Sequence, residues 1–309
     1  MLISIVIPVY NRAEMVKATL DSVKRQTFRP LQLVLVDNNS SDSTYSVLSA
    51  FKNENESDDF TIDLIKESRP GASSARNSGA KKAKGDWLMF FDSDDTMDDC
   101  LLSKYAEKIS VGNVDVVTCD LDFTKEGVTT HAYFAKKDFL VNHVFHACLS
   151  TQRYIIRKSL FDKTGGWNES LTYWDDWELG IRILLNEPRV KVIDDGVYVH
   201  VNVHDDSITG RFYSDRRCEA NKAINTAIET VMCSHYCKKI RIKRLLQSRK
   251  FVLAGLYKRE EQEDMANEYY RESLSHIKKD RILKTLSFFI YKYVGLGGRG
   301  IDRLIRFFI

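Results

Sequence analysis

The first 120 residues alternate short apolar runs with amphipathic stretches, a pattern typical of βαβ units. Each run is almost wholly apolar, as expected for parallel strands that helices cover on both faces. The sequence therefore predicts an α/β fold with a mostly parallel central sheet flanked by helices. Strands are predicted at 3–9, 31–36, 60–65 and 87–91, followed by helices at 13–26, after 41, at 73–83 and at 98–109.

The pattern loosens beyond residue 120 and becomes almost wholly helical beyond 210. The stretch 238–250 holds seven basic residues and no acid among regularly spaced apolar ones, which predicts a basic amphipathic helix. We expect one domain over 1–210 and a basic helical C-terminal region over 211–309. The mixed part between them is predicted to contain strands at 114–121, 128–134, 153–156 and 191–201 and helices at 138–147 and 174–185.

Charge is divided unevenly along the 309 residues, whose formal net charge is +3. Residues 1–210 hold 24 basic and 32 acidic side chains, whereas residues 211–309 hold 22 and 11. An acidic first part suits cation-assisted chemistry, and a basic second part suits an anionic surface, whether phospholipid or nucleic acid. Singly scattered cysteines, no apparent signal peptide and no apolar run of about 18 residues predict a cytoplasmic protein without a membrane span.

Polar side chains follow each of the first four predicted strands. Because parallel strands end at the same edge of a sheet, we expect these side chains to gather at the carboxyl edge, where such folds place their functional groups. No glycine-rich phosphate loop follows any of the strands, which weighs against Rossmann and P-loop nucleotide binding. The strand ends carry Tyr10 and Asn11, then Asp37 to Ser41, then Ser68 to Gly71, then Asp92 to Asp95.

Three carboxylates, Asp92, Asp94 and Asp95, occupy four positions behind the apolar run 87–91. Like charges this close repel and raise one another's pKa, so such a cluster faces solvent, caps a helix or holds a cation. The cluster alone supports a helix cap and a cation site equally.

Tyr10 and Asp37 together have the chemistry to hold a nucleobase. The ring of Tyr10 can stack on the base while Asp37 accepts a hydrogen bond from a ring N–H, such as N3–H of uracil. The alternative is that Tyr10 is a packing residue and that Asp37 to Ser41 form a turn with a helix cap.

Five segments in this order and spacing resemble the family 2 glycosyltransferases of the GT-A fold. The resemblance covers about residues 1–210, which it identifies as a catalytic domain, and leaves the C-terminal region without a recognisable motif. The segments are IPVYN at 7–11, VDNNSSDST at 36–44, PGASSARNSG at 70–79, GDWLMFFDSDD at 85–95 and WDDWELGIR at 174–182.

The resemblance implies a metal-dependent, inverting transfer of a sugar from a nucleoside diphosphate, most simply UDP, to a carbohydrate or lipid-linked hydroxyl in cell-surface polysaccharide synthesis. Tyr10 and Asp37 match the uracil-binding pair, with Pro8 and Val9 in the backbone around it. The three residues Asp92, Ser93 and Asp94 match the DxD motif. In it Asp94 holds Mg²⁺ or Mn²⁺ and Asp92 faces the ribose and the metal shell, which fits a hard cation shared with phosphates.

Asp176 matches the catalytic base of the family. A saccharide hydroxyl is a poor nucleophile near neutral pH, and a carboxylate that removes its proton contributes about 10²- to 10⁴-fold in rate. Trp174 and Asp175 are then predicted to bind the acceptor. A helical stripe with solvent-facing acids is the alternative, favoured for Trp177, and Asp175 could equally cap the helix.

His204 resembles a histidine near the donor phosphates, so it is predicted to join the metal shell, with His200 as a competing candidate. Arg76 and Asn77 match a segment that positions the donor, although an arginine that merely braces the sheet is equally plausible.

Two other functions compete with glycosyl transfer. A sugar-1-phosphate nucleotidyltransferase needs a basic, glycine-rich loop that residues 8–12 lack, and a catalytically silent carbohydrate- or membrane-binding relative does not need the acids at 92, 94 and 176. Segments 284–292 and 303–309 combine aromatic and basic residues, which suits a helix lying in the membrane interface, on the inner face of the membrane, or a solvated cap on the core. Nucleic acid is not expected as a partner because no module that recognises it is apparent.

Overall fold

The computed structural model describes residues 1–132, 137–204 and 212–309, which form two compact units. Each unit gathers separate stretches of the chain. Unit 1 is drawn from Met1–Lys136, Cys148–Thr172 and Asn186–Ser207, and unit 2 from Lys137–Ala147, Tyr173–Leu185 and Ile208–Ile309.

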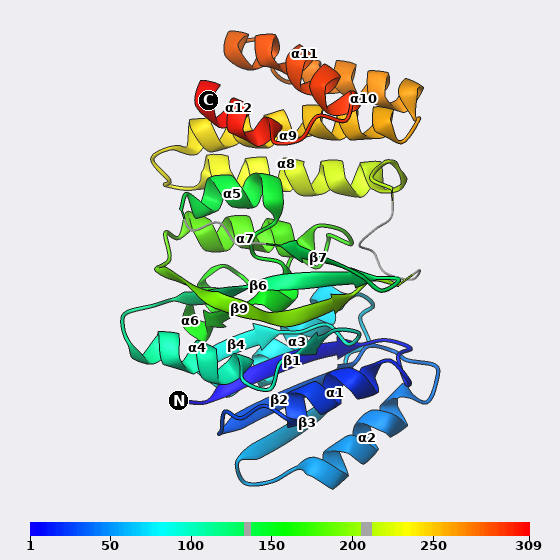
Figure 1. Ribbon diagram of the computed structural model, residues 1–309, viewed down its shortest axis with the longest axis vertical. Helices are drawn as coiled ribbons and strands as arrows, with labels where there is room; N and C mark the ends of the chain where they lie inside the picture. Colours follow the sequence, from blue (N-terminus) through cyan, green and yellow to red (C-terminus); the bar gives the residue numbers. More distant parts are fainter. Residues whose placement is uncertain (133–136, 205–211) are drawn as a thin grey trace. The chain divides into compact units, whose positions relative to one another are not determined.

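Four βα repeats open unit 1, as the sequence predicts (Figure 1). The four strands pair in parallel in the order β3-β2-β1-β4. They are β1 (Ile3–Val9), β2 (Leu31–Asp37), β3 (Phe60–Lys66) and β4 (Trp87–Phe90), and the helices are α1 (Val16–Lys24), α2 (Thr44–Asn55), α3 (Ala72–Lys82) and α4 (Leu101–Ser110).

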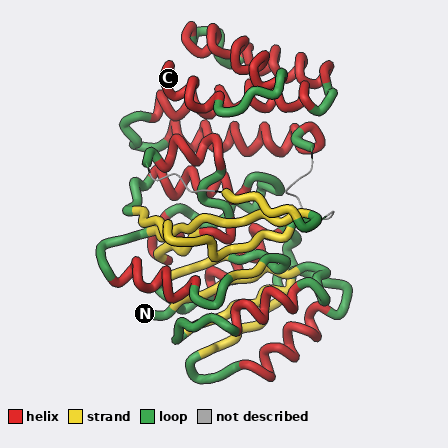
Figure 2. The backbone as a smooth tube through the Cα atoms, viewed as in Figure 1, coloured by secondary structure: helices red, strands yellow, loops and turns green. Residues whose placement is uncertain are grey.

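The rest of the sheet is mixed rather than parallel. From β4 it continues through β8, β6, β9 and β5, and β7 pairs with β6. Figure 2 shows the strands of the sheet in yellow. The pairing of β6 with β9 is parallel, whereas β8 runs antiparallel to β4 and β6. The elements are β5 (Thr96–Met97), β6 (Val116–Lys125), β7 (Val128–Ala132), β8 (Tyr154–Arg157), α6 (Lys158–Lys163) and β9 (Val190–Asn202). The last residues of the strand predicted at 128–134 lie outside the described part of the chain.

Helices cover both faces of the parallel strands. Alternate residues of β1 such as Ile5 pack with α1, α2 and α4 into the main core, where each fully buried large apolar side chain contributes about 1.5–3 kcal/mol. On the opposite face α3 approaches β1 closely, because a Cβ added to Gly79 would lie 2.3 Å from Cγ1 of Val6. This close packing holds α3 against the sheet and brings its first turn to the carboxyl edge.

Unit 2 is wholly helical in its described residues, and α9 is its centre. This helix contacts α8, α10, α11 and α5 (Figure 1). The basic stretch predicted to be helical begins α9, with Ile242, Leu245 and Leu246 buried and Ile240 exposed. The helices are α5 (Phe139–His146), α7 (Asp175–Leu185), α8 (Arg217–Cys233), α9 (Lys239–Arg259), α10 (Glu263–Ser275), α11 (Arg281–Gly295) and α12 (Ile301–Phe308).

The two units do not follow the chain order, because α5 and α7 group with the C-terminal helices. The boundary predicted between residues 210 and 211 lies outside the described residues, and the division into domains there stays a prediction. All six cysteines are free thiols. Across the described ranges, each helix is either too short or too polar to span a bilayer.

Candidate active site

The structure brings the ends of β1, β2 and β4 to one edge of unit 1. Val9 lies opposite Asp37, and the backbone N–H of Asn38 donates to the carbonyl of Val9 at 2.9 Å. On the other side of β1, the N–H of Phe91 donates to the carbonyl of Val6 at 3.0 Å. The loops that follow β2 and β4 therefore leave the sheet on either side of the end of β1, from which Tyr10 continues.

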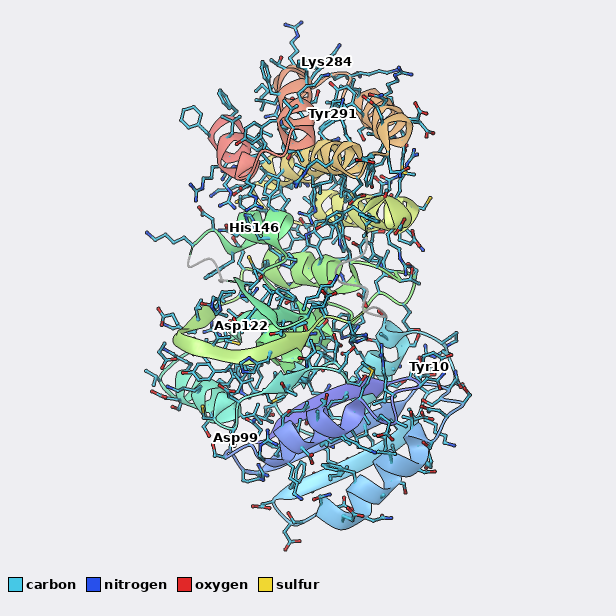
Figure 3. The ribbon with its side chains drawn as sticks, turned by 45° about the vertical axis from the view of Figure 1, so that its right-hand side comes forward. Tyr10, Asp99, Asp122, His146, Lys284 and Tyr291 are labelled. Carbon is cyan, nitrogen blue, oxygen red and sulfur yellow. The ribbon has the colours of Figure 1, made fainter. Side chains whose placement is uncertain are left out.

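Tyr10 and Asp37 differ sharply in exposure at this edge. Tyr10, labelled in Figure 3, is 59% exposed, so it is not the packing residue of the alternative interpretation. Asp37 is 3% exposed, and its Oδ1 has no hydrogen-bond partner among the described residues. It also does not cap α2, which begins at Thr44 with Ser43 as its N-cap residue, and the N–H of Thr44 donates to Oδ1 of Asp42 at 3.0 Å. An unpartnered buried acceptor costs about 1–3 kcal/mol, which a ligand N–H can offset.

The loops after β1 and β2 are cross-linked. Asn11, at a φ of 49°, accepts at Oδ1 from the N–H of Ser41 at 2.8 Å, and its own N–H donates to Oγ of Ser40 at 3.0 Å. Asparagine tolerates this left-handed conformation better than most residues. These bonds fix the loop that presents Tyr10 relative to the loop that follows Asp37.

Asp92 is held from α3 and from the segment before β8. It accepts at Oδ1 from Nη2 of Arg76 and at Oδ2 from Nε2 of Gln152, both at 2.7 Å. Arg76 is nearly buried, with its guanidinium carbon 4.4 Å from the centroid of the Trp167 ring. Arg76 thus braces the edge, as the alternative interpretation expected, and does so by orienting a carboxylate of the DxD segment. Ser93 lies beside Asp92 and is buried.

Asp95 ties this loop to β9. It is 1% exposed and accepts from Gln152 and, at 3.0 Å, from the N–H of Asn202. Burial, together with the charges of Asp92 and Asp94, raises its pKa well above the ordinary value. The helix-cap interpretation of the acidic cluster is wrong, because the next helix, α4, begins only at Leu101.

Asp94 faces His204. Its Oδ2 lies 3.0 Å from Nε2 of His204 and 3.8 Å from Nη2 of Arg12, and its side chain is about one-fifth exposed. The competing histidine, His200, instead lies 3.0 Å from a carboxylate oxygen of Asp98. Of the two histidines, His204 is therefore the one beside the DxD segment.

The side chains of Asp94 and His204 offer two ligands to a divalent cation, which suits an ion that takes its other ligands from elsewhere. In the ranges described here, no three or more His, Cys, Asp or Glu side chains are grouped so as to hold a metal. Magnesium-like ions commonly take only one or two carboxylates from the protein and complete their shell with water and substrate phosphates. The two side chains thus suit an ion that is shared with a phosphate ligand.

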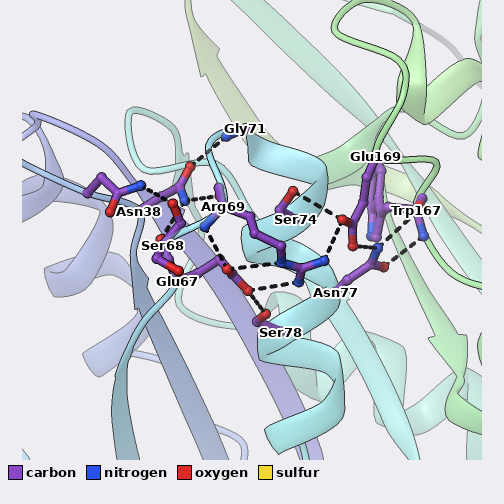
Figure 4. Close-up of polar contacts among 11 residues, drawn as sticks. Asn38, Glu67, Ser68, Arg69, Gly71, Ser74, Asn77, Ser78, Trp167 and Glu169 are labelled. Atoms are coloured by element: carbon purple, nitrogen blue, oxygen red, sulfur yellow. Dashed lines mark hydrogen bonds and ion pairs between the residues drawn. The ribbon is translucent and has the colours of Figure 1, made fainter.

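A network of polar contacts braces the start of α3 (Figure 4). The Asn77 amide donates to the carbonyl of Trp167 and to Glu169, both at 2.9 Å, and accepts from the N–H of Trp167 at 2.8 Å. Glu67 accepts from Arg69 and Ser78, and these bonds lower its pKa to about 2. Asn77 is thus engaged in bracing, and its predicted role toward the donor stays a prediction.

Sequence reasoning did not find Glu67, Gln152 or Asn202. Glu67 directly follows β3 at the carboxyl edge of the sheet. The rule that polar residues at strand ends are candidates, which identified Tyr10 and Asp37, could therefore have identified it. Gln152 and Asn202 reach the acidic cluster from the segment before β8 and from the end of β9, and nothing in their local sequence marks them.

The remaining predicted site residues belong to unit 2, at the start of α7. Asp176 is half-buried, and its Oδ1 accepts from the N–H of Trp177 at 2.6 Å. Trp174, at a φ of 58°, stacks on Tyr173 with ring centroids 5.4 Å apart. Trp177 is 1% exposed and donates from its indole N–H to the carbonyl of His143 at 3.0 Å, so it is a core residue as expected. Asp175 is half-buried in the same first turn.

Comparison with known sequences gives one family and several relatives. The family model described as glycosyl transferase family 2 matches residues 4–165. The chain is 25% identical over 214 residues to EpsJ of Bacillus subtilis, an uncharacterized glycosyltransferase, covering 64% of this chain and 60% of EpsJ. It is 25% identical over 252 residues to the E. coli UDP-Glc:alpha-D-GlcNAc-diphosphoundecaprenol beta-1,3-glucosyltransferase WfaP, covering 76% and 92%. The match thus spans less than two thirds of EpsJ but most of WfaP.

Solved structures share the fold at low sequence identity. TarS of S. aureus in complex with UDP-GlcNAc aligns with a TM-score of 0.73 at 18% identity, covering 96% of this chain and 91% of that one. The mannosyltransferase PcManGT from Pyrobaculum calidifontis, in complex with GDP-Man and Mn²⁺, aligns with a TM-score of 0.59 at 15% identity, covering 94% and 84%. At these identities the likeness concerns the fold, which is that of GT-A glycosyltransferases.

Proposed function

The chain belongs to glycosyl transferase family 2, and from that premise we propose that it moves a sugar from UDP to a saccharide hydroxyl with inversion. Family membership favours glycosyl transfer over both nucleotidyl transfer and a silent binding role. The specific donor, the metal and the acceptor follow from the chemistry of the residues at the two candidate sites.

The observation that carries the choice of UDP is the unpartnered Oδ1 of buried Asp37 beside the exposed ring of Tyr10. Uracil offers one N–H donor, N3–H, which suits a single carboxylate oxygen, and a flat face that suits stacking on a tyrosine ring. Pro8 and Val9 carry the backbone that leads to Tyr10. The hydrogen bonds of Asn11 to the loop after β2 favour a Tyr10 loop that is ordered before the nucleotide binds.

Asp94 and His204 are proposed to hold Mg²⁺ or Mn²⁺ together with the diphosphate of the donor. The bound ion supplies Lewis-acid stabilisation of the charge that develops on the leaving diphosphate, an effect of several kcal/mol. Asp92, whose oxygens are directed by Arg76 and Gln152, is proposed to face the ribose. The complex of PcManGT with Mn²⁺ supports the use of a divalent ion within this fold.

Asp176 is proposed as the general base. It takes the proton of the acceptor hydroxyl while that oxygen attacks the anomeric carbon on the face opposite the diphosphate, and this inverts the configuration. Trp174 is proposed to stack on the acceptor sugar and Asp175 to accept from one of its hydroxyl groups. The bond from the N–H of Trp177 to Oδ1 of Asp176 supports this assignment, because it fixes the carboxylate in one orientation.

A lipid-linked saccharide is the proposed acceptor, in line with the activity that the name of WfaP states and with synthesis of cell-surface polysaccharide. Such an acceptor resides in a membrane, and the C-terminal helices have the composition to bind one. Residues 281–309 hold six basic residues and one acid. The same segment exposes Phe288, Phe289, Tyr293 and Phe307. We therefore propose peripheral binding to the inner face of an anionic membrane through α11 and α12.

A donor panel tests the proposed reaction. UDP-, GDP- and dTDP-sugars are incubated with Mn²⁺ and the release of nucleoside diphosphate is measured, with EDTA as the control. We expect UDP release from UDP-sugars, and we expect EDTA to abolish it. Tyr10→Ala should slow this release by raising the KM for the donor. Turnover confined to GDP- or dTDP-sugars would contradict the assignment of Tyr10 and Asp37 to uracil.

Vesicle binding tests the membrane proposal. The double variant Phe289→Ser and Phe307→Ser removes exposed rings from α11 and α12 without touching buried residues, and Phe212→Ser, another exposed ring of unit 2, is the matched control. Sedimentation with phosphatidylglycerol vesicles should fall for the double variant alone. Equal sedimentation of all three proteins would contradict a membrane role for α11 and α12.

A further inference from the structure

A cavity of about 530 Å³ lies in unit 2 between α9 and the segment that joins α10 to α11. It is separate from the residues proposed for catalysis and lies outside the family-matched residues 4–165. Helix α9 contributes Lys243, Arg244 and Gln247 to its lining, and the joining segment contributes Lys278 and Lys279, among others.

The positive charge of this cavity is not neutralised by the described protein. The side chains of Lys243, Lys278 and Lys279 form neither an ion pair nor a hydrogen bond with any residue the structure describes. Asp280 is the acid in the lining, and it is engaged by Nε of Arg244 at 2.6 Å and by the N–H of Leu283 at 3.1 Å. Gathering unpaired like charges is unfavourable, and a bound anion relieves that repulsion.

Gln247 adds a second, independent sign of a ligand. Its side chain lines the cavity, the residue is only 8% exposed, and its amide makes no hydrogen bond within the described ranges. The accessible NH₂ group of this amide is a donor that an anion's oxygens can use. Ile277, which is 3% exposed, provides an apolar part of the lining.

We propose that this cavity binds a phosphate-bearing ligand through Lys243, Lys278, Lys279 and the amide of Gln247. Lysine ammonium groups act as point charges toward phosphate, and a neutral amide donor directs one of its oxygens. The phosphate can belong to a free phosphate or diphosphate compound or to a lipid head group. The proposal rests on unit 2 alone and holds whether or not the proposed sugar transfer does.

Two binding assays, both in EDTA to remove metal-dependent binding, distinguish these sources. Calorimetry with inorganic pyrophosphate measures the soluble ligand, and sedimentation with phosphatidylglycerol against phosphatidylcholine vesicles measures the lipid. Lys243→Gln and Gln247→Leu should each weaken binding about tenfold, as expected when a charge-assisted hydrogen bond is lost. Lys238→Gln removes a charge from the same helix outside the cavity and should leave binding nearly unchanged.

Pyrophosphate binding that depends on Lys243 and Gln247 supports a soluble phosphate ligand, and vesicle binding with that dependence supports a lipid head group. Thermal unfolding of each variant establishes that the helices are intact. The proposal is overturned if neither probe binds, or if folded Lys243→Gln and Gln247→Leu bind both probes as tightly as the Lys238→Gln control.

A second inference concerns Arg249, which α9 inserts between α5 and the start of α7. Its Nη1 donates to the carbonyls of Val144 and Phe145, at 2.6 and 2.9 Å. Its guanidinium carbon lies 4.4 Å from the ring centroid of Trp174 and 5.4 Å from that of Trp177. Desolvation lowers its pKa to about 10, so it remains a cation at neutral pH.

Trp174 needs such support. A bulky residue at a φ of 58° is strained, and strain of this kind persists only where the surroundings hold the residue in place. The carbonyl of Trp174 accepts from the N–H of Glu178 at 2.9 Å, so its conformation sets where α7 starts. Asp176 lies within that first turn.

The geometry points to Arg249 as a positioning residue that holds Trp174, and through it the turn carrying Asp176, in the conformation used for transfer. This inference rests on the proposed function of Asp176. Every contact that supports it lies within unit 2, and both Arg249 on α9 and Trp174 before α7 lie outside the residues that the family model matches.

Arg249→Met and Arg249→Lys test it, with Lys250→Met as the control. Lys250 is also buried in α9, but it bonds to Asn225 instead of approaching the tryptophans. Arg249→Met should lower kcat about tenfold with unchanged UDP affinity, and Arg249→Lys should restore part of the rate because a cation over the ring is retained. Lys250→Met should lower Tm alone.

Tryptophan emission supplies a readout that does not require transfer. Arg249→Met should shift the emission relative to both the parent and Lys250→Met, and Trp174→Phe should remove that difference. The positioning role is overturned if the emission of Arg249→Met is the same as that of Lys250→Met. A shifted emission in a protein without transfer activity would count against the proposed function alone.

Discussion

The two units of this protein build their candidate sites in different ways. In unit 1 the polar side chains follow neighbouring parallel strands, so short segments such as 7–11, 36–44 and 85–95 deliver them to one sheet edge. In unit 2 the start of α7 is held by the side chains of His143 on α5 and Arg249 on α9, which lie far from it in sequence. A sheet edge therefore concentrates its chemistry into local motifs, while helix packing distributes it over the chain.

The largest effect on the site of unit 1 is expected when the carboxylate of Asp94 is removed. Because it is proposed to hold the divalent ion, and such an ion contributes several kcal/mol, Asp94→Ala should lower the transfer rate by at least about 10³-fold. The measurement is the initial rate of UDP release with saturating Mn²⁺. Asp98→Ala, which removes the carboxylate beside His200, is the control and should retain most of the rate. A rate for Asp94→Ala close to that of Asp98→Ala would contradict the metal assignment.

Asp37→Leu sharpens the assignment of the nucleotide to unit 1. Loss of the acceptor for N3–H should raise the Kd of UDP about tenfold or more, as measured by calorimetry. Because Oδ1 of Asp37 is buried without a partner, the same change should leave the Tm of the ligand-free protein unchanged or higher. A lower Tm together with unchanged UDP affinity would assign Asp37 a structural role.

The network at α3 predicts a pH dependence of the stability of unit 1. The folded pKa of Glu67 is lowered to about 2, so its contribution is complete above the unfolded pKa and is lost as the pH falls toward 2. Glu67→Gln should lower the free energy of unfolding by about 1–3 kcal/mol near neutral pH and by less in acid. Urea unfolding at pH 7 and pH 3 measures both. An equal loss at the two pH values would contradict the ionised network.

Two glycines allow a smaller, matched comparison of packing. A Cβ at Gly79 would lie 2.3 Å from Cγ1 of Val6 in unit 1, and one at Gly180 would lie 2.3 Å from Nε2 of His143 in unit 2. Each change to alanine should cost about 1 kcal/mol after the gain in helix propensity is subtracted from the steric penalty. Hydrogen exchange should place the first effect in β1 and α3 and the second in α5 and α7. Exchange that changes across both units in either variant would contradict their description as separate compact units.

Much of unit 1 could be predicted from the sequence because its strands are buried on both faces and its turns follow regular spacing. The four βα repeats and the gathering of Tyr10, Asp37 and Asp92 at one edge came from that periodicity alone. The two-residue strand β5 and the short helix α6 were not predicted, because neither is long enough to show a period. Gln152 and Asn202 were not predicted for another reason, because only contacts between residues far apart in sequence connect them to the acidic cluster.

In unit 2 the sequence predicted helices but not their partners. The amphipathic start of α9 was correctly expected, whereas the grouping of α5 and α7 with the C-terminal helices was not. Arg249 lies within the basic stretch 238–250, where its local sequence resembles that of solvent-facing neighbours. Only the packing around Trp174 and Trp177 separates it from them.

The central claim is that Tyr10 and Asp37 bind the donor and that Asp176 is the general base, and Asp176→Asn tests it most directly. UDP affinity with Mn²⁺ and the transfer rate are measured on the same preparation. The account predicts unchanged affinity and a rate lowered by about 10²- to 10⁴-fold, the contribution of a general base. Full turnover by Asp176→Asn would contradict the claim.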